Sequence, residues 1–252
     1  MTTKIIAYKK TKNLGDAIQA IAMNVYLRSI EINSNIETDI VYRQNMCVDH
    51  FFNDSRLIVS GWHRANKEPL PKNATFISIH TDEHHLKNIN QQSIIGCRDS
   101  WTRQNCRNLG INSVITGCVT INLEADNSHK TNNILYIDSI HTSDVAKSYT
   151  QVINKNLSWD DQILMAKERL NQLRSASLVY TTRLHILIPC IAMEVPVVLD
   201  KIPTYQPERF SFFLDYIPLN QPIEKSSGIK ENLLDIWKKN SKVIMEKYLN
   251  DQ

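Results

Sequence analysis

The feature that most constrains the fold is an apolar strand–helix–strand pattern within residues 178–199. Residues 178–180 and 195–199 are short apolar runs, and residues 184–193 between them form an apolar segment of helix length. A crossover of this kind joins two parallel strands of one sheet, so the pattern predicts a βαβ unit. Pro189 must lie early in the helix or kink it, because proline lacks the backbone N–H of a helical hydrogen bond.

Arg183 and His185 stand at the junction between the first of these strands and the helix. In an open α/β sheet this junction is the carboxyl end of a strand and the amino end of a helix, where ligands and especially anions bind. The junction therefore predicts an anion site with a titratable imidazole beside it. Two structural alternatives stay open: Arg183 forms an ion pair between two subdomains, and His185 is a hydrogen-bonded core histidine.

The same alternation of short apolar runs and helical patterns continues along the chain. Strands are expected at residues 4–8, 39–42, 56–60, 75–80, 93–97, 113–116, 133–137 and 148–153, and helices at 17–30, 100–109, 159–175 and 230–249. Residues 61–73 are expected to form a loop, and the polar stretch 122–133 a linker. We therefore expect an α/β fold of two Rossmann-like subdomains facing a cleft, at residues 1–125 and 126–228, followed by a C-terminal amphipathic helix at 229–252.

Composition excludes several classes of function. Net charge is only +3 and no block of Lys and Arg occurs, so nucleic acid is not an expected partner. The six glycines include no GxGxxG fingerprint, and no Cys/His set has the spacing of a zinc site, so we expect neither a dinucleotide nor a metal. The chain has no transmembrane run or signal peptide, and its five cysteines form no CxxC pair, which favours a cytoplasmic protein with reduced thiols.

Polar residues also follow other predicted strands, at the edge where ligands bind. Asp16 precedes a helix and either contacts a ligand or caps that helix. Asp99 is better explained as the cap of the helix from residue 100, whereas Arg98 is equally consistent with a carboxylate-binding and a structural role. His80 ends a strand and either faces the cleft or lies at the surface.

Four segments, in the same order along the chain, resemble the polysaccharide pyruvyl transferase family. NLGD (13–16) is similar to the family's amino-terminal Asn-x-Gly-Asp turn, and FISIH (76–80) to one of its strands. IGCRDSWT (95–102), with GI (110–111) and TGCVT (116–120), resembles the central block, and ASLVYTTRLH (176–185) matches the block that ends in Arg-Leu-His. The resemblance spans about residues 5–215. One departure is the segment SGW (60–62), where many members carry a glycine-rich turn.

The resemblance implies an enzyme that transfers pyruvate from phosphoenolpyruvate to a pair of sugar hydroxyls as a cyclic ketal, during synthesis of a bacterial capsular or exopolysaccharide repeat unit. It also implies a fold similar to that of GT-B glycosyltransferases. The residues implied for donor binding are Arg98, Arg183, His185 and Arg209. Those implied for acceptor binding are Asn13, Asp16 and His80. The implied catalytic residues are His185, Arg183 and Asp16. No cofactor or metal is implied, because arginines can neutralise the leaving phosphate.

Two other functions stay open at this point. A nucleotide-sugar glycosyltransferase on the same fold needs an acidic residue for the ribose hydroxyls and a base-stacking pocket, and no motif indicates either. A non-catalytic glycan-binding subunit is favoured by the missing glycine-rich turn. The C-terminal helix carries several lysines around an apolar stripe and is expected to pack across the cleft. The alternative is peripheral contact with the inner face of the cytoplasmic membrane, because acceptors in such pathways are commonly lipid-linked.

Overall fold

The structure is a computed structural model that describes residues 2–5, 11–30, 55–63, 70–71, 74–87, 89, 93–125, 131–141, 147–223 and 227–250. Its first half contains β1 (Thr2–Ile5), α1 (Leu14–Ser29), β2 (Ser55–His63), β3 (Thr75–Thr81), α2 (Glu83–Leu86), β4 (Ile95–Cys97), α3 (Ser100–Asn108) and β5 (Ser113–Ile115). After the 3₁₀ helix η2 (Val119–Asn122) come β6 (Ile134–Ile137), β7 (Lys147–Tyr149), α4 (Trp159–Ser175), β8 (Leu178–Thr181), α5 (Leu184–Ala192) and β9 (Val197–Leu199). The chain ends with η3 (Pro207–Phe210), η4 (Phe213–Asp215), β10 (Pro222–Ile223) and α6 (Ser227–Asn250).

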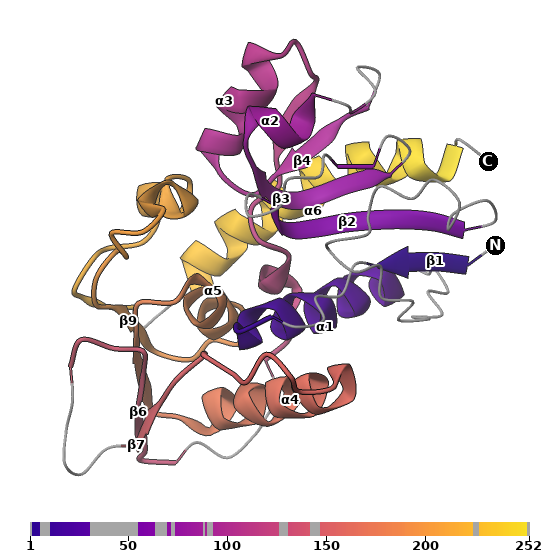
Figure 1. The fold of residues 1–252 in the computed structure, drawn as a ribbon. Helices are drawn as coiled ribbons and strands as arrows, with labels where there is room; N and C mark the ends of the chain where they lie inside the picture. Colours follow the sequence, from indigo (N-terminus) through magenta and orange to yellow (C-terminus); the bar gives the residue numbers. More distant parts are fainter. Residues whose placement is uncertain are drawn as a thin grey trace.

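The strands form two separate five-stranded sheets, which confirms an α/β architecture with parallel strands (Figure 1). The first sheet has the order β1-β2-β3-β4-β5 and is parallel throughout. The second has the order β10-β9-β8-β6-β7 and is parallel except for the β10 edge. Parallel strands place all their carboxyl ends at one edge of each sheet, and the polar turns named above follow those ends.

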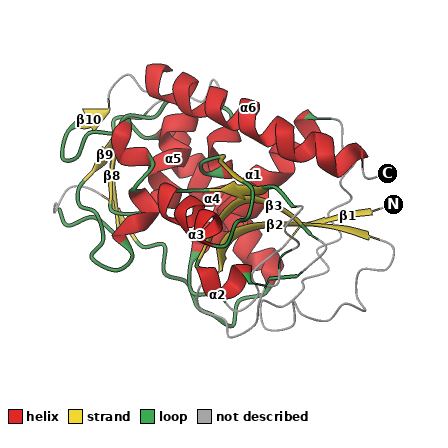
Figure 2. Ribbon diagram, turned by 90° about the horizontal axis from the view of Figure 1, so that it is seen from above, coloured by secondary structure: helices red, strands yellow, loops and turns green. Residues whose placement is uncertain are grey.

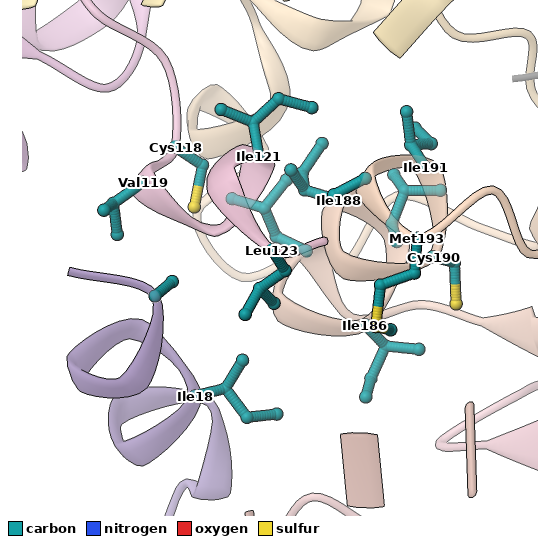
Figure 3. Close-up of a cluster of buried hydrophobic side chains, with 14 of the residues drawn as sticks. Ile18, Cys118, Val119, Ile121, Leu123, Ile186, Ile188, Cys190, Ile191 and Met193 are labelled. Atoms are coloured by element: carbon teal, nitrogen blue, oxygen red, sulfur yellow. The ribbon is translucent and has the colours of Figure 1, made fainter. Parts of the chain in front are cut away.

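Helices α1, α4 and α5 and the short helix η2 fill the space between the sheets. Although α1 follows β1 in the chain, it packs against α4, α5 and η2 (Figures 1 and 2). Figure 3 shows the apolar core at this place, where Ile18 of α1 and Ile121 of η2 face Ile186 and Ile188 of α5. Within the expected linker, Leu123 belongs to the core together with Val119 and Ile121 of η2, and residues 126–130 lie outside the described ranges.

Backbone hydrogen bonds also join the two halves at the amino end of α1. Leu14 N–H donates to the Gln151 carbonyl (2.9 Å), and Ile153 N–H donates to the Lys12 carbonyl (2.9 Å). The turn before α1 is thus fixed to the segment after β7, although more than half the chain separates them. This contact carries the first polar turn into the space beside the second sheet.

The C-terminal helix α6 crosses from one half to the other. It packs against α5 and η2 at one end and against β3, β4 and β5 at the other. Trp237 is fully buried against the edge of the Tyr26 ring of α1, and Asn240 Nδ2 donates to the Ile115 carbonyl (2.6 Å). Its buried stripe and its exposed Lys238, Lys239 and Lys242 fit the packed arrangement expected from the sequence. No helix among the described residues is long and apolar enough to span a membrane.

Several element boundaries differ from those predicted. β2 continues through Gly61 to His63, where a loop was expected, because the register shifts between Val59 and Gly61 and Gly61 adopts φ +93°. A bulge of this kind lets the strand continue past a glycine. β7 begins at Lys147 and ends at Tyr149, so the expected strand over 148–153 is shorter and shifted. The strand expected at 39–42 and residues 6–8 of the first lie outside the described residues.

Other elements confirm the sequence prediction closely. α4 spans Trp159–Ser175 as expected, and the Ser158 hydroxyl accepts from the Asp161 N–H at its amino end (3.1 Å). α3 ends before Gly110, which adopts φ +68° and stops the helix. Local capping signals of this kind depend on neighbouring residues, so the sequence alone locates them.

Candidate active site

Asn13 caps helix α1 and fixes the first polar turn. Its Oδ1 accepts from Gly15 N–H (3.1 Å), and its Nδ2 lies 3.4 Å from Asp16 Oδ1. The helix therefore begins at Leu14, and the expectation that Asp16 caps a helix from residue 17 is wrong. Asp16 lies in the first turn instead, where its Oδ2 accepts from the Thr11 hydroxyl (2.5 Å). A carboxylate in the first turn is stabilised by the helix dipole.

Gly15 allows the imidazole of His185 to lie directly against the first turn of α1. A Cβ atom at position 15 would lie 2.6 Å from His185 Nδ1 and 2.9 Å from His185 Cβ, which is closer than side-chain atoms approach one another. The glycine of the NLGD segment is therefore needed for close contact between α1 and α5. It joins two motifs that are distant in sequence but adjacent in the fold.

Pro189 determines the backbone around His185. Position 189 lies four residues after His185, so the His185 carbonyl has no helical N–H donor and the proline ring crowds it. His185 accordingly has φ −84° and ψ 21°, outside the helical region, although the helix continues on both sides of it. Of the two alternatives for Pro189, a position early in the helix or a kink, the structure shows the kink, and it falls at the histidine itself.

Arg98 and Gln19 contact His185 on its two ring nitrogens. Arg98 follows β4, is fully buried, and places Nη1 3.5 Å from His185 Nε2 and 3.5 Å from Gln19 Oε1. Gln19 Nε2 lies 3.4 Å from His185 Nδ1. The three side chains come from α1, the β4–α3 turn and α5, so both halves of the protein build this cluster. At 3.4–3.5 Å these contacts are long, which leaves room for shorter bonds to a ligand.

His80 and Asp99 form a second buried pair beside Arg98. His80 Nδ1 lies 2.6 Å from Asp99 Oδ2, and both side chains are fully buried. Asp99 Oδ1 accepts from the Thr102 N–H (2.9 Å) and hydroxyl (2.8 Å), so Asp99 caps α3 as predicted. The alternative that His80 lies at the surface is wrong: its ring stacks on Trp101 with centroids 5.1 Å apart. A carboxylate on Nδ1 leaves Nε2 as the free basic nitrogen of the ring.

Arg209 of η3 completes a strongly cationic region. Burial, with the nearby Arg98 charge as the second cause, lowers the pKa of the Arg209 guanidinium to about 10. Arg209 is half-buried and remains charged at neutral pH, so two like charges lie close together, one of them fully buried. The donors Arg98 Nη2 and Arg209 Nε are buried and have no hydrogen-bond partner among the described residues. Buried donors without partners are costly, and an anionic ligand would satisfy them.

This environment keeps His185 neutral. Burial, and then the positive charges of Arg98, Arg209 and Arg183, lower the pKa of His185 well below its ordinary value. Burial also lowers the pKa of His80, although Asp99 opposes the shift. Asp99 stays ionised: burial raises its pKa, but the hydrogen bond to His80 and the charges of His80 and Arg98 outweigh this and lower it. The site therefore holds two arginine cations, one carboxylate and two neutral imidazoles at neutral pH.

Arg183 is placed differently from the other predicted donor-binding residues. It is the amino-terminal flanking residue of α5, its side chain is partly exposed, and its Nε donates to Asp138 Oδ2 (2.8 Å). Asp138 follows β6 of the same sheet, so the ion pair lies within the second half of the protein and does not brace two subdomains. Arg183 still lies close enough to His185 to lower its pKa.

Comparisons with known proteins identify the family of this chain. A sequence profile described as Polysaccharide pyruvyl transferase matches residues 13–199, from the α1 cap to the end of β9. The chain belongs to the polysaccharide pyruvyl transferase family. A crystal structure of a functionally uncharacterised protein from Klebsiella pneumoniae is similar in fold, with a TM-score of 0.50 and 14% sequence identity over 83% of this chain and 87% of that one. A comparison with curated proteins gives no significant match.

Within this transferase family member, the structure gathers most of the residues that the sequence singled out. His185, Arg98, Arg209 and His80 interact electrostatically at one place, and Asp16 perturbs Arg209 from the α1 turn. Sequence reasoning missed Gln19 and Trp101. Gln19 follows Asp16 by three residues and therefore shares its helix face, which is the signal that would have found it. Trp101 sits in the central motif, but only the structure shows that its ring covers His80.

Replacing Gly15 by Ala in this pyruvyl transferase family member should displace His185. The added methyl group would overlap Nδ1, and the ring is buried between Gln19 and Arg98, so it must shift away from its present contacts. We expect the rate of the transfer reaction proposed below to fall about 10²-fold, because an error of about 1 Å in position has that effect. Gly228→Ala is the matched control, since a Cβ there meets nothing within 4 Å. Equal rates for Gly15→Ala and the wild type would show that the contact with His185 is not needed.

Proposed function

We propose that this protein transfers a pyruvyl group from phosphoenolpyruvate to two hydroxyls of a sugar, forming a cyclic ketal. The observation that carries the proposal is the fully buried Arg98 together with the buried Nε of the half-buried Arg209, whose free N–H groups lie beside His185 at the amino end of α5. Phosphoenolpyruvate carries a phosphate and a carboxylate, and guanidinium groups match both in charge and geometry. Membership of the family supports the reaction class.

The donor must first accept a proton at C3, which makes C2 electrophilic. His185 is the proposed acid, because it lies against Arg98 where the donor is proposed to bind, and the charge of a bound anion would raise its lowered pKa. A first sugar hydroxyl then attacks C2 and loses its proton. A second hydroxyl attacks C2 as the C–O bond to phosphate breaks, and its proton passes to the leaving phosphate. The products are the ketal and inorganic phosphate. Arg98 and Arg209 stabilise the charge that grows on the leaving phosphate, so the step as proposed uses no metal.

His80 is the proposed base for the attacking hydroxyl. Asp99 holds its Nδ1, so its Nε2 is the nitrogen that accepts a proton, and this atom has no partner among the described residues. A carboxylate that orients an imidazole in this way is a common arrangement for proton transfer. Asp16 is the alternative base inferred from the family resemblance. Its carboxylate already accepts a hydrogen bond from Thr11, which suits a residue that positions the acceptor.

Donor binding should be coupled to uptake of a proton. In the free protein, burial and the three arginines keep His185 neutral, whereas a bound phosphate and carboxylate raise its pKa again. Affinity for phosphoenolpyruvate should therefore increase as pH falls through the pKa of His185 in the complex, down to its lower pKa in the free protein. Calorimetry in two buffers with different ionisation enthalpies measures the uptake. The His185→Gln variant should lose this uptake; an unchanged value in the variant would assign the proton to another group.

The reaction itself is tested by phosphate release from phosphoenolpyruvate without added metal. The acceptors are galactose-, glucose- and mannosamine-terminated oligosaccharides, free and lipid-linked. Acceptor-dependent release, with a product heavier by one pyruvate less one water, is the expected result. No release, together with tight binding of a nucleotide sugar, would instead favour a glycosyltransferase.

We further propose that the two sheets with their intervening helices function as in GT-B transferases, with donor and acceptor meeting where both halves contribute residues. Gln19, Arg98 and His185 support this, because they come from opposite halves of the chain and contact one another. The proposed biological role is addition of a carboxylate to a capsular or exopolysaccharide repeat unit in the cytoplasm. The exposed lysines of α6 would suit an acceptor held at the inner face of the membrane.

A further inference from the structure

A second pocket lies at the carboxyl edge of the second sheet. It has a volume of about 560 Å³, within the ordinary range for small-ligand sites. Tyr180 and Val198 line its wall from the sheet, and His141, Asp200, Lys201 and Leu219 line it from the segments that follow the strands. Of these six residues only Tyr180 lies within a family motif, and none belongs to the cationic cluster around Arg98.

Asp200 gives this pocket a buried hydrogen-bond acceptor. Asp200 is only 2% exposed, and its backbone N–H donates to the Thr181 carbonyl (3.0 Å). Its Oδ2 accepts hydrogen bonds from the Ser139 hydroxyl and from the Ile140 N–H. Its Oδ1 has no hydrogen-bond partner within the described part of the chain, and His141 Nε2 stands 3.9 Å away. A fixed carboxylate oxygen in a pocket wall requires a donor from a ligand, and a hydroxyl group supplies one.

Tyr180 gives the pocket a fixed aromatic surface. Its ring stacks on Tyr136 with centroids 5.0 Å apart, and the His141 ring meets it edge-on at 5.7 Å. Strand register aligns Tyr136, Tyr180 and Val198 on one face of the sheet. The alternate residues Val179 and Val197 belong to the core, towards which α5 packs. The aromatic row thus lies on the sheet face opposite α5, beside the carboxylate.

An apolar wall next to a buried carboxylate fits a neutral ring that bears hydroxyl groups. The C–H face of such a ring packs on apolar and aromatic side chains, while adjacent hydroxyls donate to the carboxylate. A phosphate or carboxylate ligand would be repelled by Asp200 at the buried end. Lys201, which is exposed at the rim, balances the charge of Asp200 and leaves the pocket close to neutral.

The pocket shares its supporting residues with the proposed active site. Asp138 binds Arg183, and the next residue, Ser139, binds Asp200. Thr181, which holds the Asp200 backbone, is two residues before Arg183. A molecule in the pocket therefore occupies the same sheet edge as the amino end of α5.

We propose that this pocket binds a pyranose unit of the acceptor glycan, adjacent to the unit that receives the pyruvyl group. That the bound sugar belongs to the acceptor rests on the proposed function, whereas sugar binding in the pocket is tested separately. It assigns recognition of the glycan chain to Asp200 and Tyr180, and donor chemistry to the Arg98 cluster.

Saturation-transfer NMR with methyl β-galactopyranoside, methyl β-glucopyranoside and uridine, in the absence of phosphoenolpyruvate, tests the pocket. Leu219→Trp fills it and should abolish the glycoside signals, whereas Leu164→Trp makes the same change on the exposed face of α4 and should leave them intact. Asp200→Asn should weaken glycoside binding about tenfold or more. Ile140 N–H still requires an oxygen at the Oδ2 position, so the Asn amide nitrogen would replace the free acceptor Oδ1.

The outcomes separate this inference from the proposed function. Glycoside signals that survive Leu219→Trp, or uridine binding without glycoside binding, would overturn the pocket proposal. Calorimetry with phosphoenolpyruvate then checks the donor site independently: Arg98→Met should lose donor binding and keep glycoside binding. If the wild type binds glycosides in the pocket but no phosphoenolpyruvate, the donor assignment fails while the sugar site stands.

Discussion

Replacing Arg98 by Met should nearly abolish pyruvyl transfer. The Arg98 guanidinium is fully buried, contacts His185 and has free N–H groups, so in the proposed reaction it binds the donor in both the ground state and the transition state. Loss of one such cation from a phosphoryl-transfer or oxyanion site lowers rates by about 10³-fold or more. We expect a decrease of that size in kcat/KM, measured by phosphate release.

The matched control is Arg107→Met, which removes an exposed arginine from the last turn of α3 and should leave the rate unchanged. A second readout separates a role in the site from a structural role. Because the Arg98 charge helps to lower the pKa of His185, the pKa should rise in Arg98→Met, and NMR titration of the imidazole measures this. A folded Arg98→Met protein with normal turnover would contradict the assignment of Arg98 to the donor site.

Replacing His185 by Gln should remove the proposed proton donor and retain the donor-binding cations. Glutamine is polar and close in length, so Gln19 and Arg98 keep a hydrogen-bonding neighbour. General acid catalysis contributes about 10²–10⁴-fold, so we expect kcat to fall by about 10³-fold. The Kd for phosphoenolpyruvate should change by less than about tenfold, since Arg98 and Arg209 remain. Rapid-quench turnover and calorimetry measure the two quantities.

The pH profile distinguishes an acid from a core histidine. If His185 donates the proton, kcat of the wild type decreases as pH rises through the pKa of His185 in the donor complex, and His185→Gln lacks this dependence. His84→Gln, which changes an exposed histidine of α2, should leave both the rate and the profile unchanged. A His185→Gln protein that is less stable but has the wild-type kcat per folded molecule would assign a purely structural role.

The site has an unusual balance of charges that explains why both changes should be severe. Burial and then the charge of Arg98 lower the pKa of Arg209, so the two arginines oppose each other, and the buried Asp99 is already held by His80 and by the Thr102 backbone. Asp99, 3.8 Å from Arg98 Nε, and Asp16 offset part of this charge, but donors of both guanidinium groups keep no hydrogen-bond partner among the described residues where the donor is proposed to bind. Strain of this kind is relieved by an anion, which links the stability of the site to donor binding.

The sequence by itself determined the local parts of this protein. Apolar periodicity located most strands and helices, Ser158 and Asp99 marked helix starts, and Gly110 marked a helix end, because each signal depends on residues a few positions apart. The Arg-Leu-His and Asn-Leu-Gly-Asp segments also identified the family, which the profile over residues 13–199 confirms.

Only the tertiary structure decided which of these residues meet. Gln19 and His185 are 166 positions apart, and their contact depends on the packing of α1 against α5, which no local pattern encodes. The same packing explains the glycine at position 15, because His185 occupies the space that a side chain there would need. The sequence did not distinguish a His80 that faces the cleft from one at the surface, and the structure shows the side chain buried against Asp99. The structure also shows that Arg183 is held by an ion pair with Asp138. Local signals set helices and strands, whereas long-range packing sets distances between charges, and those distances determine the chemistry of the site.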